Sequence, residues 1–262
     1  MAEHEHGAHG SPGEGALSGM SIVVTGAGTG IGRSIAECLV EAGAGITAVG
    51  RRKAPLEDLA AQAGEAVQAV AADIATPGSP RQIVDTAVTR FGRLDAVVNN
   101  AGLARFGRLD EIDPEELDAV LRVNVRAPAD LIRCALPQLR AHRGSVVNIS
   151  SVAGALAMPE RSFYGASKAA LNSLTRSLAR ELAPEVRVNA ILPGPVDTPM
   201  WHETGLTETD RRQLAENLTA ATPMGRFGRG REIGRWVCCL LDPAMSGWVT
   251  GALIPVDGGR TS

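Results

Sequence analysis

Short β-rich runs alternate with helical stretches along nearly the whole chain, and this alternation limits the possible folds more than any other feature. Several runs, such as Ser21–Thr25 and Ala96–Asn99, are almost continuously apolar, as is usual for strands that are covered on both faces. Strands and helices that alternate over this length predict a parallel sheet with helices on each side.

The expected elements can be placed from these patterns. Strands are expected at Ser21–Thr25, Gly45–Val49, Ala66–Ala72, Asp95–Asn99, Gly144–Ile149, Val186–Leu192 and Ala252–Val256. Helices are expected at Ile31–Ala42, Ala54–Ala63, Ser79–Phe91, Pro114–His142, Phe163–Ala183 and Glu232–Leu241, and the fourth of these is expected to divide near Pro128. Together they predict an α/β fold, a Rossmann-type doubly wound parallel sheet of about seven strands, in one domain over residues 20–262.

Two segments differ from this pattern. Residues 1–19 contain mainly Gly, His, Glu and Ala, and we expect them to form a disordered tail. Their histidines His4, His6 and His9 could hold a transition metal loosely, but a solvated tail is the simpler interpretation, and no metal site is expected. Residues 194–230 show no strand pattern and hold several turn residues, so we expect a substrate lid over the carboxyl edge of the sheet.

Composition and charge exclude several classes of protein. The net charge is -3, and no basic stretch is interleaved with aromatic residues, which argues against nucleic acid as a partner. The apolar runs are too short to cross a membrane, and the N-terminus shows no secretory signal. Four cysteines without CxxC spacing are typical of a reduced, cytoplasmic protein. The excess of Arg over Lys and the high Ala content favour a bacterial coding sequence.

A glycine-rich segment lies where the first expected strand meets the first expected helix. Glycines at this junction let the backbone turn sharply and approach a pyrophosphate, while the helix N-terminus offers free N–H groups. The spacing Gly-x3-Gly-x-Gly differs from the simple GxGxxG pattern. We expect a dinucleotide to bind through Gly26, Gly28, Thr29, Gly30, Ile31 and Gly32.

The end of the second expected strand bears on which dinucleotide is bound. An acidic residue there would hold the ribose 2′-hydroxyl of NAD, but the sequence reads Gly50-Arg51-Arg52-Lys53. Three cations after a glycine suit the 2′-phosphate of NADP(H), although a solvated basic turn has the same composition. Further cofactor contacts are expected from residues that follow the third and fourth strands: Asp73, Ile74, Asn100, Ala101 and Gly102.

The only tyrosine of the chain, Tyr164, stands four residues before Lys168, one of only two lysines. Residues at this spacing lie on one face of a helix. The ammonium can stabilise a phenolate and lower the pKa of the tyrosine, which can then exchange a proton with an alcohol near neutral pH. Alone the YxxxK pattern is weak, because an exposed helix face with a chance Tyr and Lys looks the same.

Taken in order, the segments TGAGTGIG, NNAG, YGASK and PGPVDTPM, together with Asn124 and Ser151, resemble the motifs of the short-chain dehydrogenase/reductase family. The resemblance extends from about Met20 to Gly259. The overall pattern of motifs is similar to that of the 3-oxoacyl-carrier-protein reductases and small-alcohol dehydrogenases of that family. We therefore expect an enzyme that transfers a hydride between a nicotinamide and a C=O or CH–OH group.

The resemblance also implies roles for individual residues. Tyr164 would be the general acid/base, Lys168 would lower the pKa of Tyr164 and bind the nicotinamide ribose, and Ser151 would stabilise charge on the substrate oxygen. Asn124 would hold a water that links Lys168 to solvent. Around the nicotinamide the resemblance implies contacts from Tyr164, Lys168, Pro193, Gly194, Val196 and Thr198.

One departure from the family pattern concerns the cofactor. Many NADP-dependent relatives carry a basic residue just before the middle glycine of the loop, where this chain has Thr29. Arg51, with Arg52, must then recognise most of the 2′-phosphate. NADP(H) is the preferred cofactor, and NAD(H) stays open.

The expected substrate pocket is mostly apolar. Its expected lining is Leu103, Val152, Met158, Pro195, Met200 and Trp201, together with Ala104 and Phe106. Arg161 and His202 could contact a polar group, but ordinary loop residues explain both. The pocket therefore favours a mainly hydrophobic ketone or secondary alcohol, such as a carrier-bound β-ketoacyl group, a polyketide or another secondary metabolite.

Three functions are compatible with these residues. The favoured one is an NADP(H)-dependent ketone reductase or alcohol dehydrogenase, with an NAD-dependent alcohol dehydrogenase as its variant. The second keeps the cofactor for an epimerisation or dehydration. The third is a non-catalytic protein that senses NADP(H), which the retained Tyr164 and Lys168 disfavour. The resemblance further implies a homotetramer, with a homodimer as the alternative.

Overall fold

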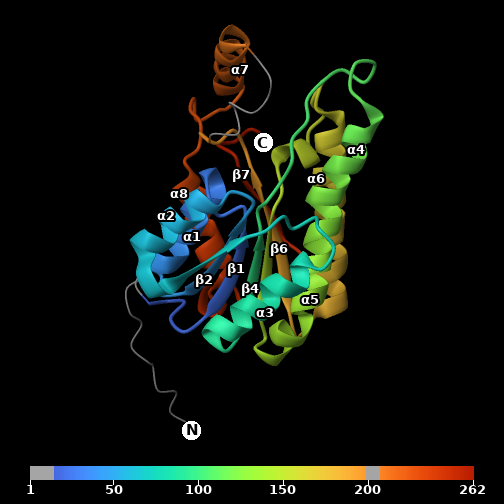
Figure 1. The fold of residues 1–262 in the computed structure, drawn as a ribbon. Coiled ribbons are helices and arrows are strands. Elements are labelled where there is room, and N and C mark those ends of the chain that lie inside the picture. The colour runs from blue at the N-terminus through green and yellow to red at the C-terminus, as the bar shows by residue number, and fades with distance from the viewer. Residues whose placement is uncertain (1–14, 199–206) are drawn as a thin grey trace.

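The computed structural model describes residues 15–198 and 207–262. Its centre is a seven-stranded sheet in the order β3-β2-β1-β4-β5-β6-β7, and all neighbouring strands are parallel (Figure 1). The strands are β1 (Ser21–Thr25), β2 (Gly45–Gly50), β3 (Val67–Ala71), β4 (Ala96–Asn99), β5 (Ser145–Ile149), β6 (Arg187–Pro193) and β7 (Leu253–Val256). The predicted Rossmann-type fold is confirmed, and each strand end lies within one residue of its predicted place.

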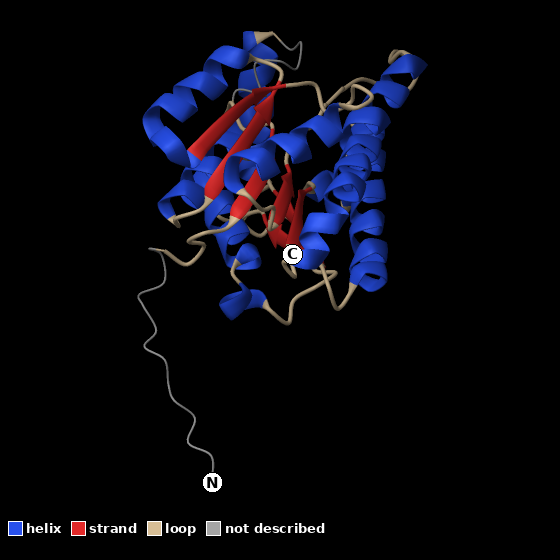
Figure 2. Ribbon diagram, turned by 60° about the horizontal axis from the view of Figure 1, so that its bottom comes forward, coloured by secondary structure: helices blue, strands red, loops and turns tan. Residues whose placement is uncertain are grey.

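Helices cover both faces of this sheet, as Figure 2 shows in blue around the red strands. Successive residues of a buried strand point to opposite faces, so Ile22 and Val24 pack in one apolar cluster and Val23 in the other. The first cluster includes residues of α1 (Gly30–Glu41), α2 (Lys53–Ala63) and α8 (Gly230–Leu241). The second includes residues of α3 (Ser79–Phe91), α5 (Ala127–Ala141) and α6 (Ser162–Leu182).

The predicted tail is too long. Leu17 is only 1% exposed, and its N–H donates to the Ala42 carbonyl at 3.0 Å. Residues 15–19 therefore pack against the domain, because one leucine inserts beside α1. A single apolar residue among polar neighbours has no periodicity that would reveal this. The predictions for His4, His6 and His9 fall outside the described residues.

The long helical stretch 114–142 divides earlier than expected. It consists of α4 (Pro114–Leu121), a π-helical turn at Arg122–Arg126 and α5. Pro128 lies in the first turn of α5, directly after the π-helical turn. The break therefore falls at the turn that contains Asn124.

The expected lid region is only partly described. It contains α7 (Glu208–Ala220), and Val196 forms an isolated parallel bridge with Gly228. The short helix α9 (Pro243–Ser246) and two 3-10 turns, Gly64–Ala66 and Val152–Gly154, complete the described elements. Within the described ranges, none of the helices has the length and apolar character needed to cross a membrane.

Candidate active site

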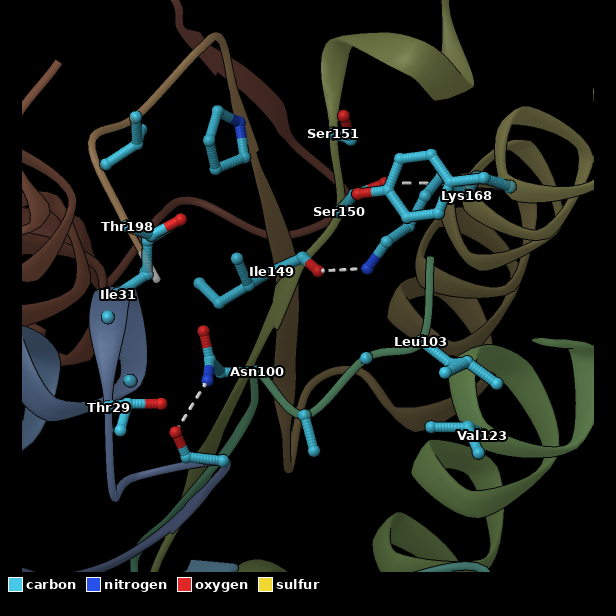
Figure 3. A pocket seen from close by; sticks show the side chains of 18 of the residues that line it. Thr29, Ile31, Asn100, Leu103, Val123, Ile149, Ser150, Ser151, Lys168 and Thr198 are labelled. Atoms are coloured by element: carbon cyan, nitrogen blue, oxygen red, sulfur yellow. Dashed lines mark hydrogen bonds between the residues drawn. The ribbon is translucent and has the colours of Figure 1, made fainter. Parts of the chain in front are cut away.

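A cavity of about 340 Å³ lies at the carboxyl ends of the strands (Figure 3). It is next to the boundary between β1 and β4, where the order of the strands in the sheet reverses its direction. Open α/β sheets bind their ligands at this switch point. The structure brings all the predicted cofactor residues to this one cavity: Gly26, Gly28, Thr29, Gly30, Ile31, Gly32, Arg51, Arg52, Asp73, Ile74, Asn100, Ala101, Gly102, Tyr164, Lys168, Pro193, Gly194, Val196 and Thr198.

The glycine-rich loop is held by the end of β4. Asn100 Nδ2 donates to the Thr25 carbonyl at 2.9 Å, and the backbone N–H groups of Asn100 and Ala101 both donate to Thr25 Oγ1 at 3.0 Å. A Cβ added to Gly32 would come within 3.0 Å of the Gly26 carbonyl and of Asn100 Nδ2. The loop therefore needs glycine here, and the NNAG segment fixes the shape of the loop.

The N-terminus of α1 is open toward the cavity. Thr29 precedes it in an extended conformation, its side chain makes no capping hydrogen bond, and the first turn holds no acidic residue. Such a terminus offers unpaired N–H groups and a positive dipole end, which suit a pyrophosphate. These residues fit a dinucleotide, which the glycine-rich loop and Asn100 would hold.

The three cations after β2 are used differently. Lys53 pairs with Glu57 at 2.9 Å and does not line the cavity. Arg52 Nη2 donates to Thr29 Oγ1 at 3.3 Å, so its side chain reaches across the mouth of the loop. Arg51 is exposed at the rim of the cavity and forms no ion pair with any described residue.

Lys168 lies at the other end of the cavity and is almost completely buried. Only 4% of it is exposed, and Nζ donates to the Ile149 carbonyl at 2.8 Å (Figure 3). Burial disfavours the charged form and lowers the pKa of Lys168 to about 8. Its Nζ lies 5.8 Å from the centroid of the Tyr164 ring. The predicted pairing of the two side chains on one helix face is therefore present in α6.

The pKa of Tyr164 departs from the prediction. Burial raises it above its usual range, and a hydrogen bond from Ser151 together with the charge of Arg161 lowers it by less. Sequence reasoning recognised the nearby cation but not the desolvation, which depends on how the surrounding segments pack.

Ser151 is the second residue after β5 and lies beside Tyr164. Its Oγ accepts the Ala153 N–H at 3.1 Å, which leaves the hydroxyl hydrogen for Tyr164 or a substrate oxygen. Ser150 behaves differently, since its Oγ donates to the Lys168 carbonyl at 3.3 Å. The preference for Ser151 over Ser150 agrees with these contacts.

Asn124 does not line the cavity, and its side chain is occupied by protein groups. Its Oδ1 accepts the Leu103 N–H at 2.7 Å, and its Nδ2 donates to the Leu103 carbonyl and to Ser167 Oγ, both at 2.9 Å. Ser167 Oγ in turn donates to the Tyr164 carbonyl at 2.7 Å. The water predicted at Asn124 stays a prediction. The side chain ties the segment after β4 to α6.

The predicted substrate residues divide into two groups. Leu103, Val152, Met158 and Pro195 line the cavity, as does Phe106, while Met200, Trp201 and His202 lie outside the described residues. Arg161, named from the sequence as a possible polar contact, also lines the cavity, whereas Ala104 does not. The structure adds Val123, Leu218 and Arg260 to the lining. Nothing in the local sequence distinguishes Arg260.

The fold and the site define a nicotinamide-dependent oxidoreductase. A family model described as enoyl-(acyl carrier protein) reductase matches residues 26–261. A 3-oxoacyl-[acyl-carrier-protein] reductase of Thermotoga maritima is 33% identical over 249 residues, which are 93% of this chain and 98% of the relative. L-fucose dehydrogenase of Rattus norvegicus is 34% identical over 254 residues, which are 94% of this chain and 90% of the relative.

Solved structures agree with this match. A 3-ketoacyl-(acyl-carrier-protein) reductase from Brucella melitensis, complexed with NADH, has a TM-score of 0.86 at 31% identity, with 94% of this chain and 100% of that chain covered. The chain therefore belongs to the short-chain dehydrogenase/reductase family. It is an NAD(P)-dependent oxidoreductase that acts on CH–OH and C=O groups.

Proposed function

We propose that this protein transfers a hydride between NADP(H) and a mainly apolar ketone or secondary alcohol, with Tyr164 as the general acid/base. The observation that carries the proposal is a single cavity with the glycine-rich loop at one end and Ser151, Tyr164 and Lys168 at the other. A cofactor bound along the loop would bring its nicotinamide toward these side chains. The apolar lining of Leu103, Val152, Met158 and Pro195 supports the apolar substrate.

The side chains divide the proton chemistry between them. When bound, the nicotinamide supplies or accepts the hydride. In reduction, Ser151 donates a hydrogen bond to the carbonyl oxygen and Tyr164 gives that oxygen its proton. The raised pKa keeps Tyr164 protonated at neutral pH, which suits the role of proton donor. Lys168, with a pKa of about 8, stays mainly charged at pH 7 and stabilises the phenolate that remains.

The preference for NADP(H) rests on the tip of β2. Gly50 leaves room beside the ribose, and Arg51 and Arg52 line the cavity there. A phosphate dianion would pair with the exposed guanidinium of Arg51, which forms no ion pair within the described part of the chain. A carboxylate for a ribose 2′-hydroxyl is absent from this tip, where the residues are Gly50 to Lys53.

A fluorescence titration with NADPH and with NADH tests this preference through energy transfer from tryptophan. We expect NADPH to bind at least about tenfold more tightly, because two charge-assisted contacts discriminate for the phosphate. Arg51→Gln should remove most of this difference. Lys53→Gln is the matched control, since Lys53 lies outside the cavity. Equal binding of both cofactors would favour the NAD-dependent alternative.

The catalytic part is tested by Tyr164→Phe. Loss of the phenolic proton should lower kcat for ketone reduction about a hundredfold or more, while the Kd for NADPH changes little. A variant that retains full turnover would remove Tyr164 from its role. A wild-type protein that binds NADPH but reduces no ketone and oxidises no alcohol would support the alternative of an NADP(H)-sensing protein.

We further propose a homotetramer in a reduced, cytoplasmic setting. Trp248 is completely exposed, and Trp236 (43%) and Met245 (62%) add to the exposed apolar surface of α8, α9 and the segment that leads to edge strand β7. Exposed apolar groups beside an open edge suit a subunit contact. All four cysteines are free thiols, as a reduced compartment maintains them. Light scattering of wild type and Trp248→Glu tests the assembly.

A further inference from the structure

Arg161 places a guanidinium in the cavity, where no described carboxylate pairs with it. It caps the start of α6 and is partly buried, with Cζ 4.8 Å from the centroid of the Phe106 ring. Its Nη1 has only a weak contact with Met158 Sδ, at 3.8 Å. Among the described residues no carboxylate lies within ion-pair distance of it. Burial lowers the pKa of Arg161, which reflects the cost of holding this charge away from water.

Arg260 brings a second guanidinium to the same cavity from the end of the chain. Its Nη1 donates to the Ala221 carbonyl at 3.0 Å, but its Nε is buried and has no hydrogen-bond partner within the described ranges. The nearby Asp257 does not pair with it. That carboxylate instead accepts the N–H groups of Gly259 and Thr261, both at 2.9 Å, and the Thr261 hydroxyl.

The two guanidiniums line the same cavity. The charge of Arg260 is the second cause, after burial, of the lowered pKa of Arg161, and the opposing effect of exposed Glu160 is smaller. Two like charges at one cavity wall, with unused donors, carry an electrostatic cost that a bound anion would offset. Guanidinium groups bind carboxylates and phosphates through paired hydrogen bonds.

We propose that Arg161 and Arg260 bind an anionic group, a carboxylate or a phosphate, on the ketone or alcohol substrate. This inference rests on the function proposed above and narrows its substrate class. The Phe106 ring packs edge-on against Tyr164, with centroids 6.0 Å apart, and its face lies under Arg161. The anionic group therefore sits near the reacting carbonyl, and the substrate is a ketone with an apolar body and one charged end.

The test compares charged ketones with neutral counterparts of the same carbon skeleton around the carbonyl. The carboxylate arm uses 4-oxopentanoate and 5-oxohexanoate against their methyl esters, and the phosphate arm uses dihydroxyacetone phosphate against dihydroxyacetone. Reduction is followed by NADPH absorbance. We expect the charged member to have at least about tenfold higher kcat/KM in one of these pairs, as charge-assisted hydrogen bonds provide. The arm that shows the preference identifies the anion.

Substitutions then assign the preference to the two residues. Arg161→Gln and Arg260→Gln should each reduce the charged-to-neutral ratio of kcat/KM about tenfold, mainly through KM. Arg180→Gln is the matched control, since Arg180 is exposed on the same helix and does not line the cavity. If Arg161 acts only on Tyr164, the Arg161→Gln variant loses activity equally toward both members of a pair, and the charged-to-neutral ratio stays unchanged. An unchanged ratio, or a preference for the neutral member in every pair, overturns the inference.

A binding measurement separates this inference from the proposed function. Calorimetric titration of the NADP⁺-loaded protein with 5-oxohexanoate and with dihydroxyacetone phosphate requires no turnover. Binding that weakens at least about tenfold in both arginine variants supports the anion site, even if no ketone is reduced and the proposed function fails. Absent or arginine-independent binding overturns the anion site, even if neutral ketones are reduced well.

Discussion

Gly32→Ala is the sharpest perturbation of the nucleotide loop. The added Cβ would come within 3.0 Å of the Gly26 carbonyl oxygen and of Asn100 Nδ2. Neither atom can yield easily, because one is backbone and the other donates to the carbonyls of Thr25 and Gly26, at 2.9 and 3.3 Å. Overpacking of this kind costs about 2–4 kcal/mol. For a chain of this size that lowers Tm by roughly 5–15 °C.

Gly28→Ala is the matched control in the same loop. Its Cβ would meet Pro55 Cβ at 3.3 Å and Leu56 Cδ2 at 3.7 Å, and both are side-chain atoms. Unlike Gly26 and Gly30, Gly28 does not have a positive φ, so an alanine at this position causes no backbone strain. We expect its Tm to stay within about 2–4 °C of wild type, a change of about 1 kcal/mol.

Differential scanning fluorimetry with and without NADPH measures both effects. Gly32→Ala should lower Tm in the free protein and reduce the stabilisation by NADPH, because the displaced loop no longer approaches the pyrophosphate. The reasoning is refuted if the two alanine variants melt at the same temperature. It is also refuted if Gly32→Ala binds NADPH like wild type.

Three further outcomes follow from other sites. The kcat/KM of ketone reduction should fall as the pH rises through about 8, where Lys168 loses its proton, whereas residual activity of Lys168→Arg should show no such fall. Leu17→Ala should lower the free energy of unfolding in urea by about 2–4 kcal/mol, and Leu109→Ala, at a position 74% exposed, by much less. Arg187→Met should destabilise by about 2 kcal/mol, because Arg187 donates to the carbonyls of Leu240, Ser246 and Val249.

The strands could be located from the sequence because a buried parallel strand needs an apolar run, and each run marks one strand. Their ends shift by one residue, since pairing with the neighbour determines where a strand stops. The meeting of the loop, Asp73 and Asn100 at one cavity was predictable because all of them follow strands, and parallel strands end at one edge. Local sequence and common topology together are sufficient for this part of the site.

The remaining features depend on contacts between distant segments. Arg260 reaches the cavity only because the end of the chain returns beside α6, and no local pattern records that return. Asn124 occupies a π-helical turn whose hydrogen bonds join the segment after β4 to α6. The direction of the Tyr164 pKa shift follows from burial, which a Tyr–Lys spacing does not encode.

The charges around the cavity connect the cofactor preference with the substrate inference. Five cations line it, at Arg51, Arg52, Arg161, Lys168 and Arg260, and Asp73 is the only carboxylate in the described lining. This concentration of positive charge occurs in a chain whose net charge is -3. Because Arg51 and Arg161 stand at opposite ends, one ligand does not offset both. Two anionic ligands, a phosphorylated cofactor and a charged ketone, would each occupy one end of the cavity. Each would neutralise the cations nearest to it, and together they would lower the repulsion among the cations of the cavity.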